Sequence, residues 1–361
     1  MLTLRDVEDA AARIAGRVVR TPTLPSEAVG RAVGAAVFLK LEIFQATGSF
    51  KERGAANRLA LLSPAEREAG VIAMSAGNHA QGVARHASLA GIPATIVMPR
   101  FTPATKVSRT AGWGARVALH GETLVECAAH AALLAEREGL TMIHPYDDPA
   151  VIAGQGTLAL ELLADAPEID MLVVPVGGGG MIAGAAVAAA ALKPGIEIVG
   201  VEVESYAALA QRLAGTPVSV GGATIAEGIA VRDIGDLPFS IIRELVAEVL
   251  VVPEQAIEQA IALLAEGAKL VAEGAGAAAV AALLAFPGRF RGRKVGLPVC
   301  GGNIDPRIFA NVLLRNLLRD GRLLRLSLEI PDRPGVLADI AGKIGGAGGN
   351  IIDVSHHRMF A

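Results

Sequence analysis

Lysine and cysteine are both scarce in this sequence of 361 residues, which contains seven lysines against 26 arginines and only two cysteines. Cys127 and Cys300 lie far apart, which argues against a disulfide framework or a metal knuckle and favours a reduced, cytoplasmic setting. The formal net charge of -3 leaves no basic face for nucleic acid. The first residues, MLTLRDVEDAAARIAG, also lack the basic and then apolar pattern of a signal peptide.

One run of 22 residues, 171–192, carries no charge and is long enough to suggest a membrane span. Pro175 and four consecutive glycines interrupt it, however, and alanine dominates its second half. A buried strand, a glycine loop and a buried helix fit this pattern better. We therefore expect no membrane segment.

Short apolar runs alternate with longer helical patterns along most of the chain. The runs predicted to be strands are residues 35–42, 71–77, 94–99, 115–121, 171–176, 196–203 and 294–300. Strands buried on both faces read as continuous apolar runs, and helices between them provide the crossovers of a parallel sheet. The sequence therefore predicts an α/β protein with parallel sheets, long enough for two or three domains. From about Arg322 the pattern changes to strand, helix, strand, with a turn at residues 331–335.

One of the few lysines stands in an unusual setting, in the stretch GSFKERGAANRL (residues 48–59). Lys51 follows Phe50 and precedes a charged pair, and a lysine becomes a nucleophile only when it is desolvated or otherwise deprotonated. The alternative is an exposed lysine in the first turn of a helix, because Ser49-x-x-Glu52 matches a capping box. Both interpretations can hold together, since a capped helix start would fix the lysine.

Three further stretches follow predicted strands and carry small or polar residues. SAGNHAQG (75–82) leads into a helix, so its backbone amides and the side chains of Ser75, Asn78 and His79 could bind a carboxylate; an ordinary strand-to-helix turn is the alternative. VGGGGMIAG (176–184) lets several amides point at one phosphate. VCGGNID (299–305) presents Cys300 either as a neutral thiol to a ligand or as a buried filler.

The glycine loop has a competing interpretation as a dinucleotide site. Gly178-x-Gly180-x-x-Ala183 matches the fingerprint with alanine in the third place, and Glu202 follows 24 residues after Gly178, where a ribose-binding acid belongs. An NAD-binding oxidoreductase is therefore an alternative. A lysine, a phosphate cradle, an anion-binding turn and a neutral thiol together instead indicate pyridoxal phosphate.

The sequence resembles the fold-type II pyridoxal-phosphate enzymes, specifically threonine dehydratase (threonine ammonia-lyase) and its relative serine racemase, over residues 5–318. The motifs are FQATGSFKERGA, SAGNHAQG, DPAVIAGQGT, VPVGGGGMIAG, TIAEGIAV and CGGNID. The resemblance implies that Lys51 is the Schiff-base lysine and the catalytic residue. It implies that the cofactor is held by Phe50, Lys51, Asn78, Gly177, Gly178, Gly179, Gly180, Met181 and Cys300. It also implies that the substrate carboxylate is received by Ser75, Asn78 and His79.

The implied activity is the β-elimination of L-threonine, and of L-serine, to 2-oxobutanoate or pyruvate and ammonia. Two departures bear on serine racemase, the alternative beside serine dehydratase. Racemases carry a serine at the place of Ala76, and alanine has no proton to give the opposite face of Cα. The racemase cation site has its second carboxylate where this chain has Ala208, so we expect no metal site there.

The resemblance also implies a domain plan. The large cofactor-binding subdomain would comprise residues 1–43 and 148–320, the small substrate-binding subdomain residues 44–147, and a partial ACT-like regulatory domain residues 321–361. An amino-acid effector at that tail and a homodimer or homotetramer are further expectations. Isoleucine synthesis and threonine breakdown both stay open as the metabolic role.

The alternative from a different class is a non-catalytic protein that senses amino acids through its ACT-like tail. Such a protein would have lost Lys51 or the glycine loop, and neither is lost.

Overall fold

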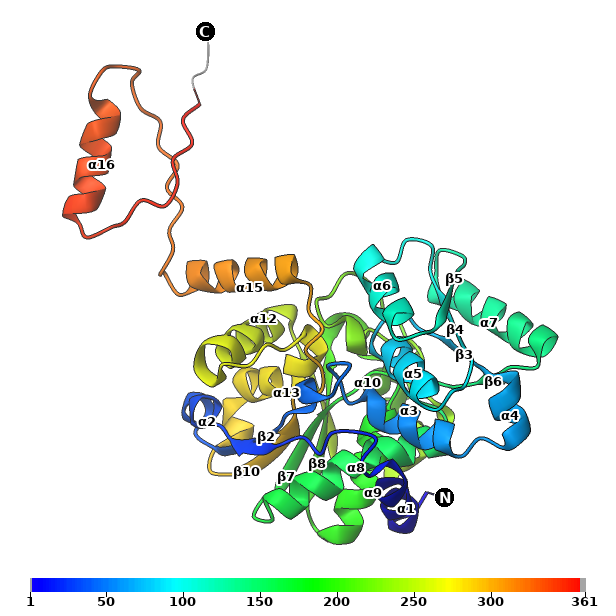
Figure 1. The fold of residues 1–361 in the computed structure, drawn as a ribbon. Coiled ribbons are helices and arrows are strands. Elements are labelled where there is room, and N and C mark those ends of the chain that lie inside the picture. The colour runs from blue at the N-terminus through cyan, green and yellow to red at the C-terminus, as the bar shows by residue number, and fades with distance from the viewer. Residues whose placement is uncertain (1, 358–361) are drawn as a thin grey trace. The chain divides into compact units, whose positions relative to one another are not determined.

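Two sheets organise the first of the two units into which the chain divides, Met1–Asn316 and Leu317–Ala361 (Figure 1). The computed structural model describes residues 2–357. All neighbouring strands of both sheets are parallel except the first pair, β1 and β2. This confirms the predicted α/β class with parallel-sheet subdomains.

The larger sheet has six strands in the order β1-β2-β10-β7-β8-β9. Their bounds are β1 Thr23–Pro25, β2 Ala36–Lys40, β7 Met171–Pro175, β8 Glu197–Val203, β9 Glu248–Val252 and β10 Lys294–Pro298. β7 is fully buried, as expected for the centre of a sheet covered on both faces. The apolar run 171–192 is therefore a core strand, a glycine loop and a core helix. Among residues 2–357 no helix combines the length and apolar character that a bilayer span requires.

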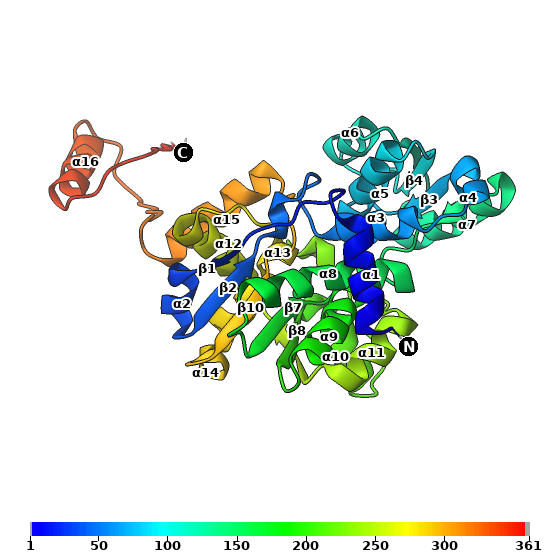
Figure 2. The same cartoon turned by 60° about the horizontal axis from the view of Figure 1, so that its bottom comes forward.

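Helices cover both faces of this sheet and bury two separate cores (Figure 2). One face carries α1 Leu4–Ile14, α8 Pro149–Asp165, α9 Gly180–Leu192, α10 Ala208–Leu213 and α11 Asp236–Leu245. The other face carries α2 Glu27–Val33, α12 Glu254–Leu263, α13 Gly274–Ala285, α14 Pro287–Phe290 and α15 Pro306–Arg319. The short turns are η1 Glu42–Phe44, η2 Glu204–Tyr206, η3 Glu227–Ile229 and the π-helix η4 Leu264–Ala268.

The smaller sheet has four strands in the order β5-β4-β3-β6 and is formed by chain inserted between β2 and α8. Its strands are β3 Val71–Met74, β4 Ala94–Met98, β5 Arg116–Leu119 and β6 Thr141–Met142. Its helices are α3 Lys51–Ala60, α4 Pro64–Ala69, α5 Asn78–Leu89, α6 Ala104–Gly112 and α7 Leu124–Glu138. α3 and α5 pack on one face and α7 on the other.

The two sheets are joined by close backbone contacts. Phe50 N–H donates to the Cys300 carbonyl at 3.0 Å, and Ser49 forms an isolated antiparallel bridge with Gly301. α3 also lies directly on α8, because a Cβ on Gly154 would come within 2.6 Å of the Arg53 carbonyl. The residues around Lys51 are therefore held against the end of strand β10 and against helix α8, which packs on the larger sheet.

Beyond the last residues of α15, the second unit contains one helix, α16 Val336–Gly346, among its described residues. The predicted helix is confirmed, but the two predicted flanking strands are wrong for the described residues, because 323–330 and 350–357 are not assigned as strands. A strand needs a hydrogen-bonded neighbour, and within residues 317–357 no backbone hydrogen bond joins these segments. Residues 358–361, which the predicted second strand approaches, lie outside the described residues. The ACT-like assignment stays a prediction.

Candidate active site

A cavity of about 1070 Å³ contains every residue that the sequence singled out as a site residue. Its walls include Phe50, Lys51, Ser75, Asn78, His79, Gly177, Gly178, Gly179, Gly180, Met181 and Cys300. These residues come from four stretches of sequence that are far apart. The structure therefore brings the four predicted motifs together around one space large enough for a cofactor and a small substrate.

Topology explains this convergence. Residues 75–79 follow β3, residues 176–180 follow β7 and residues 299–303 follow β10. The carboxyl ends of parallel strands meet at one edge of a sheet, where α/β proteins bind ligands. Here the loop after β3 of the smaller sheet and the loops after β7 and β10 of the larger sheet line the same cavity. Two of the loops lead directly into helices, α5 and α9, whose first N–H groups attract anions.

Lys51 is the first residue of α3, and its amine faces the cavity. Its Nζ donates to the Pro145 carbonyl at 2.8 Å and lies 5.2 Å from the centre of the Phe50 ring. Burial lowers the pKa of Lys51 to about 8, against a smaller opposing effect of Cys300. A larger fraction of the amine is thus neutral near pH 7 than for an exposed lysine, as a nucleophile requires.

The predicted capping box at the start of α3 is wrong. Phe50 is the N-cap and makes no side-chain capping bond, and the buried hydroxyl of Ser49 has no hydrogen-bond partner in the described structure. Glu52 instead accepts from the backbone of Thr47 and from Arg85. The carboxylate is therefore used to join α3 to α5. The lysine's backbone is fixed by two backbone hydrogen bonds, from the Phe50 N–H to the Cys300 carbonyl and from the Gly302 N–H to the Gly48 carbonyl.

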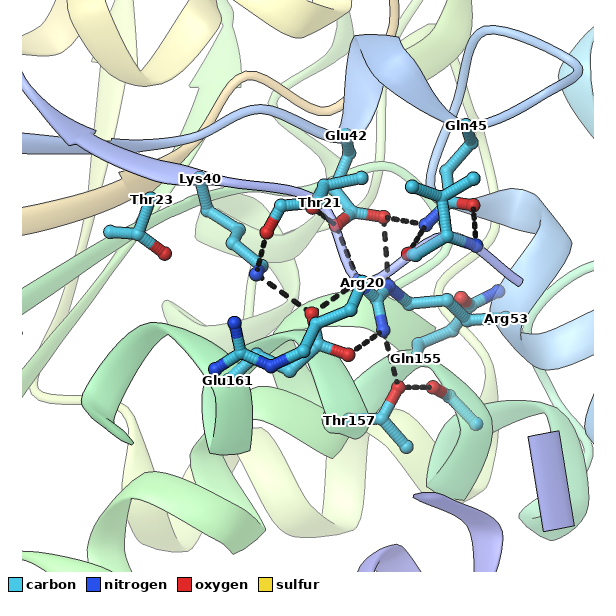
Figure 3. A network of polar contacts seen from close by, with 12 residues as sticks. Arg20, Thr21, Thr23, Lys40, Glu42, Gln45, Arg53, Gln155, Thr157 and Glu161 are labelled. Atoms are coloured by element: carbon cyan, nitrogen blue, oxygen red, sulfur yellow. Dashed lines mark hydrogen bonds and ion pairs between the residues drawn. The ribbon is translucent and has the colours of Figure 1, made fainter. Parts of the chain in front are cut away.

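A buried ionic network anchors α3 two residues after the lysine (Figure 3). Arg53 donates two hydrogen bonds to Glu42, at 2.8 and 2.7 Å, and two to Glu161, at 2.7 and 2.8 Å. Lys40 approaches Glu161 at 2.7 Å. The side chains of Arg53, Glu42 and Lys40 are fully buried. Because Glu161 is on α8 and Lys40 ends β2, the network ties the helix that begins with Lys51 to the larger sheet.

The glycine loop has no room for side chains. A Cβ on Gly178 would lie 2.3 Å from the ring of Tyr146, and one on Gly180 would lie 2.8 Å from the Tyr146 carbonyl. Gly179 has φ of +92°, which favours glycine. The loop therefore presents backbone amides to the cavity at the N-terminus of α9, an arrangement that fits a phosphate.

The turn after β3 differs in detail from the prediction. Ser75 accepts a hydrogen bond from the Gly77 N–H at 3.2 Å. His79 uses one ring nitrogen, Nε2, on the Ile143 carbonyl at 3.0 Å, and burial, with the charge of Lys51, lowers its pKa to about 3. The ring is neutral, so its single N–H is already used. The assignment of His79 to the substrate carboxylate stays a prediction, and the backbone amides of the turn are suited to that role.

Cys300 provides a neutral thiol at the cavity wall. Its Sγ donates to the Ala275 carbonyl at 3.4 Å, and burial raises the pKa of the thiol well above its usual range. A neutral thiol at the cavity wall agrees with the interpretation of Cys300 as a thiol presented to a ligand. Together with the lysine and the glycine loop, it gives the residues that pyridoxal phosphate would need.

Three of the cavity residues that the sequence analysis did not single out have contacts that shape the site. Glu273, just before α13, accepts from the Asn78 amide at 2.6 Å, and Asn303 donates to the oxygen of that amide at 2.7 Å. Tyr146 covers the glycine loop. Glu273 could have been noticed as the lone acid in the apolar stretch 270–285, and Asn303 stands inside a motif that was already recognised.

The dinucleotide alternative loses its second feature in the structure. Glu202 is buried, and its two oxygens accept from the N–H groups of Leu209 and Ala210 at 2.8 and 2.9 Å, so that the carboxylate lies at the start of α10. Glu202 does not line the cavity. The acid that should bind a ribose is therefore occupied elsewhere.

Comparison with known proteins decides the family. Residues 14–301 match the family model described as "Pyridoxal-phosphate dependent enzyme". The chain belongs to the pyridoxal-phosphate dependent enzymes. The predicted family and its cofactor, pyridoxal phosphate (PLP), are thereby confirmed, and the NAD-binding alternative is set aside.

Relatives within this enzyme family narrow the resemblance. The chain is 42% identical over 366 residues to a protein of Thermotoga maritima named L-threonine ammonia-lyase, covering 99% of this chain and 90% of that one. Among solved structures, a serine racemase from maize has a TM-score of 0.82 at 36% identity, covering 89% and 99% of the two chains. The processed form of threonine deaminase isoform 2 from Solanum lycopersicum has a TM-score of 0.82 at 33% identity, covering 87% and 88%.

Proposed function

We propose that this enzyme is an L-threonine ammonia-lyase, which converts L-threonine to 2-oxobutanoate and ammonia, and L-serine to pyruvate and ammonia. The observation that carries the proposal is that the amine of Lys51, whose pKa is lowered, shares one cavity with the glycine loop and the neutral thiol of Cys300. The similarity to proteins named L-threonine ammonia-lyase supports this substrate.

The residues of the cavity fit PLP as follows. Gly177, Gly178, Gly179, Gly180 and Met181 would hold the phosphate, Lys51 would bond covalently to the aldehyde carbon, and Phe50 would pack beside the ring. Asn78 would donate to the phenolic oxygen and Cys300 would face the pyridine nitrogen. When bound, PLP supplies an electron sink that makes the bonds at the substrate's Cα and Cβ easier to break.

Lys51 acts as the general base in this proposal. Its amine would become free when the substrate's amino group takes its place at the aldehyde carbon, and its lowered pKa would leave part of it neutral near pH 7, ready to remove the proton from the substrate's Cα. The Pro145 carbonyl, which accepts from Nζ, gives the amine a fixed resting position. The backbone amides at the start of α5 bind the substrate carboxylate, with Ser75 beside them.

The thiol of Cys300 favours elimination over proton return. A carboxylate facing the pyridine nitrogen would stabilise a positive charge there, whereas a buried neutral thiol does not. Electrons released at Cα are then more readily used to expel the β-hydroxyl. Ala76, which has no proton to donate, gives no means of reprotonating the opposite face of Cα, so lyase activity should exceed racemisation.

Closure of the small subdomain, residues 44–147, over the rest would exclude water from the reacting groups. Lys106 on α6 forms an ion pair with Glu227 on η3 at 2.5 Å, and both residues line the cavity. This pair connects a helix of the smaller sheet's layer with a loop of the larger sheet's layer. Opening would have to break this contact.

The remaining expectations also belong to this proposal. The enzyme would work in the cytoplasm as a homodimer or homotetramer, in either isoleucine synthesis or threonine breakdown. The unit from residue 317 onward would act as a partial ACT-like domain that binds an amino-acid effector. Alternating exposed leucines at 324, 326 and 328 support a surface that is completed by another segment or chain.

The proposal is tested by incubating the PLP-loaded protein with L-threonine, L-serine and D-threonine and measuring 2-oxo acids, ammonia and D-serine. We expect 2-oxobutanoate from L-threonine and pyruvate from L-serine, with far less D-serine. Formation of D-serine faster than pyruvate would favour the racemase alternative. Absence of any 2-oxo acid from the loaded protein would contradict the proposal.

A further inference from the structure

Glu273 places a carboxyl group in the cavity, and this group has no part in the reaction proposed above. Its Oε1 accepts from Asn78 Nδ2 at 2.6 Å, and its backbone N–H donates to the Gly301 carbonyl at 3.0 Å. The carboxyl lies so close to Gly301 that a Cβ there would come within 2.2 Å of Oε1. Gly301 therefore leaves the space that this carboxyl group occupies.

The Asn78 amide is held at both ends. Asn303 Nδ2 donates to the Thr47 carbonyl and to Asn78 Oδ1, each at 2.7 Å. A backbone carbonyl only accepts, which fixes Asn303 with its NH₂ group toward Thr47 and Asn78. The oxygen of Asn78 must then face Asn303, and its NH₂ must face Glu273. One N–H of Asn78 remains for the cavity.

We propose that Glu273 is a positioning residue of the active site, which holds the Asn78 amide as a hydrogen-bond donor to the cofactor. The proposal rests on the cofactor assignment made above but not on the identity of the substrate. Without the acceptor at Glu273, only the Asn303 bond restrains Asn78, and its free N–H loses its fixed direction. An acceptor at this place thus decides how well the cofactor's phenolic oxygen is bound.

Glu273 also makes this positioning dependent on pH. Burial raises the pKa of Glu273 to about 7, opposed by the hydrogen bond from Asn78 and by Lys106, and reinforced by Glu227. Cys300, the other titratable group next to it, stays neutral. Above pH 7 the ionised carboxylate accepts strongly from Asn78, and below pH 7 the protonated group accepts more weakly.

Other titratable groups also line the cavity, and substitution of Glu273 separates its contribution from theirs. The pKa of His79 is lowered to about 3 and that of free Lys51 to about 8. Burial also lowers the pKa of His144 and raises that of Tyr146. A spectral change of the bound cofactor near pH 7 can therefore be assigned to Glu273 by substitution.

The test uses the PLP-loaded enzyme without substrate and records its visible absorbance band from pH 5.5 to 9 (a range of about three units around the expected midpoint). We expect the wild type to show a step near pH 7 and Glu273→Gln, which keeps an oxygen acceptor but cannot ionise, to lose that step. A step of unchanged midpoint in Glu273→Gln would overturn the proposal, as would a wild-type band that is constant over this range.

Two neighbouring variants serve as matched controls and keep the test decisive if Glu273→Gln does not fold. Glu227→Gln removes a negative charge near Glu273 and should lower the midpoint, whereas Lys106→Met removes a positive charge and should raise it. Midpoints that do not move in these directions contradict the assignment to Glu273. Because no substrate is present, a failure of the lyase proposal would appear separately, as missing 2-oxobutanoate beside an intact spectral step.

Discussion

Replacing Arg53 with methionine removes the cation at the centre of the buried network while keeping a side chain of similar length. Arg53 makes four hydrogen bonds to Glu42 and Glu161. Glu161 keeps Lys40 as a partner, but Glu42, which is fully buried, keeps only the hydroxyl of Thr21 and the amide of Gln45. The change thus leaves a buried carboxylate with no cation in direct contact, and Lys40 acts on it only from a longer distance.

Removing one partner of a buried ion pair costs about 3 to 5 kcal/mol of unfolding free energy, because the remaining charge is uncompensated. For a unit the size of Met1–Asn316, typical unfolding entropies per residue convert this loss into a fall in Tm of about 5 to 8 °C. Arg116→Met is a matched control, since Arg116 pairs with Glu138 at 2.9 Å but is more than half exposed. We expect that control to change stability by about 1 kcal/mol or less.

Thermal unfolding of the wild type, Arg53→Met, Arg116→Met and the double variant Arg53→Met/Glu42→Gln tests this reasoning. The double variant should be more stable than Arg53→Met alone, because it removes the unpaired carboxylate. If Arg53→Met unfolds at the wild-type temperature, or if the double variant is less stable than the single one, Arg53 does not compensate the charge of Glu42.

Two further predictions concern the cofactor site. Gly178→Ala should weaken PLP binding strongly, because the new Cβ would lie 2.3 Å from the Tyr146 ring. Gly112→Ala is the control and should not weaken binding, because its Cβ would meet nothing within 4 Å. Equal affinities in a titration of the two apoenzymes with PLP would contradict the steric argument. The apoenzyme should capture PLP covalently at a rate that rises with pH and levels off above about 8, because the pKa of Lys51 is lowered and the neutral amine is the reactive form. A stopped-flow rate that continues to rise tenfold per pH unit beyond about 9 would indicate an ordinary lysine instead.

The fold and the site were predicted where local patterns and strand ends decide them. The glycine loop and Cys300 were recognised because each follows an apolar run, and parallel strands collect such residues at one edge, whereas Lys51 was recognised by its place directly after Phe50. The predicted capping box was wrong because the Glu52 side chain contacts α5 instead. Its partner there, Arg85, is 33 residues away in the sequence, and no local pattern shows such a contact. A pattern cannot foresee such a tertiary contact.

Other features depended on pairs that are distant in the sequence. Glu273 meets Asn78 across 195 positions, and Arg53 meets Glu161 across 108. No local pattern in the sequence predicts either pair. The two predicted strands of the C-terminal unit failed for a related reason, since an alternating apolar pattern indicates a strand but not the neighbour with which it must pair.

The central claim is that the amine of Lys51 holds the cofactor and carries the reaction. The most direct measurement is the absorbance spectrum of the purified protein with PLP, before and after addition of L-threonine, recorded beside Lys51→Ala with 2-oxobutanoate as the product. We predict a visible band that Lys51→Ala loses or alters, and 2-oxobutanoate from the unmodified protein alone. A protein that cannot be loaded with PLP, or a Lys51→Ala variant with undiminished turnover, would contradict the account.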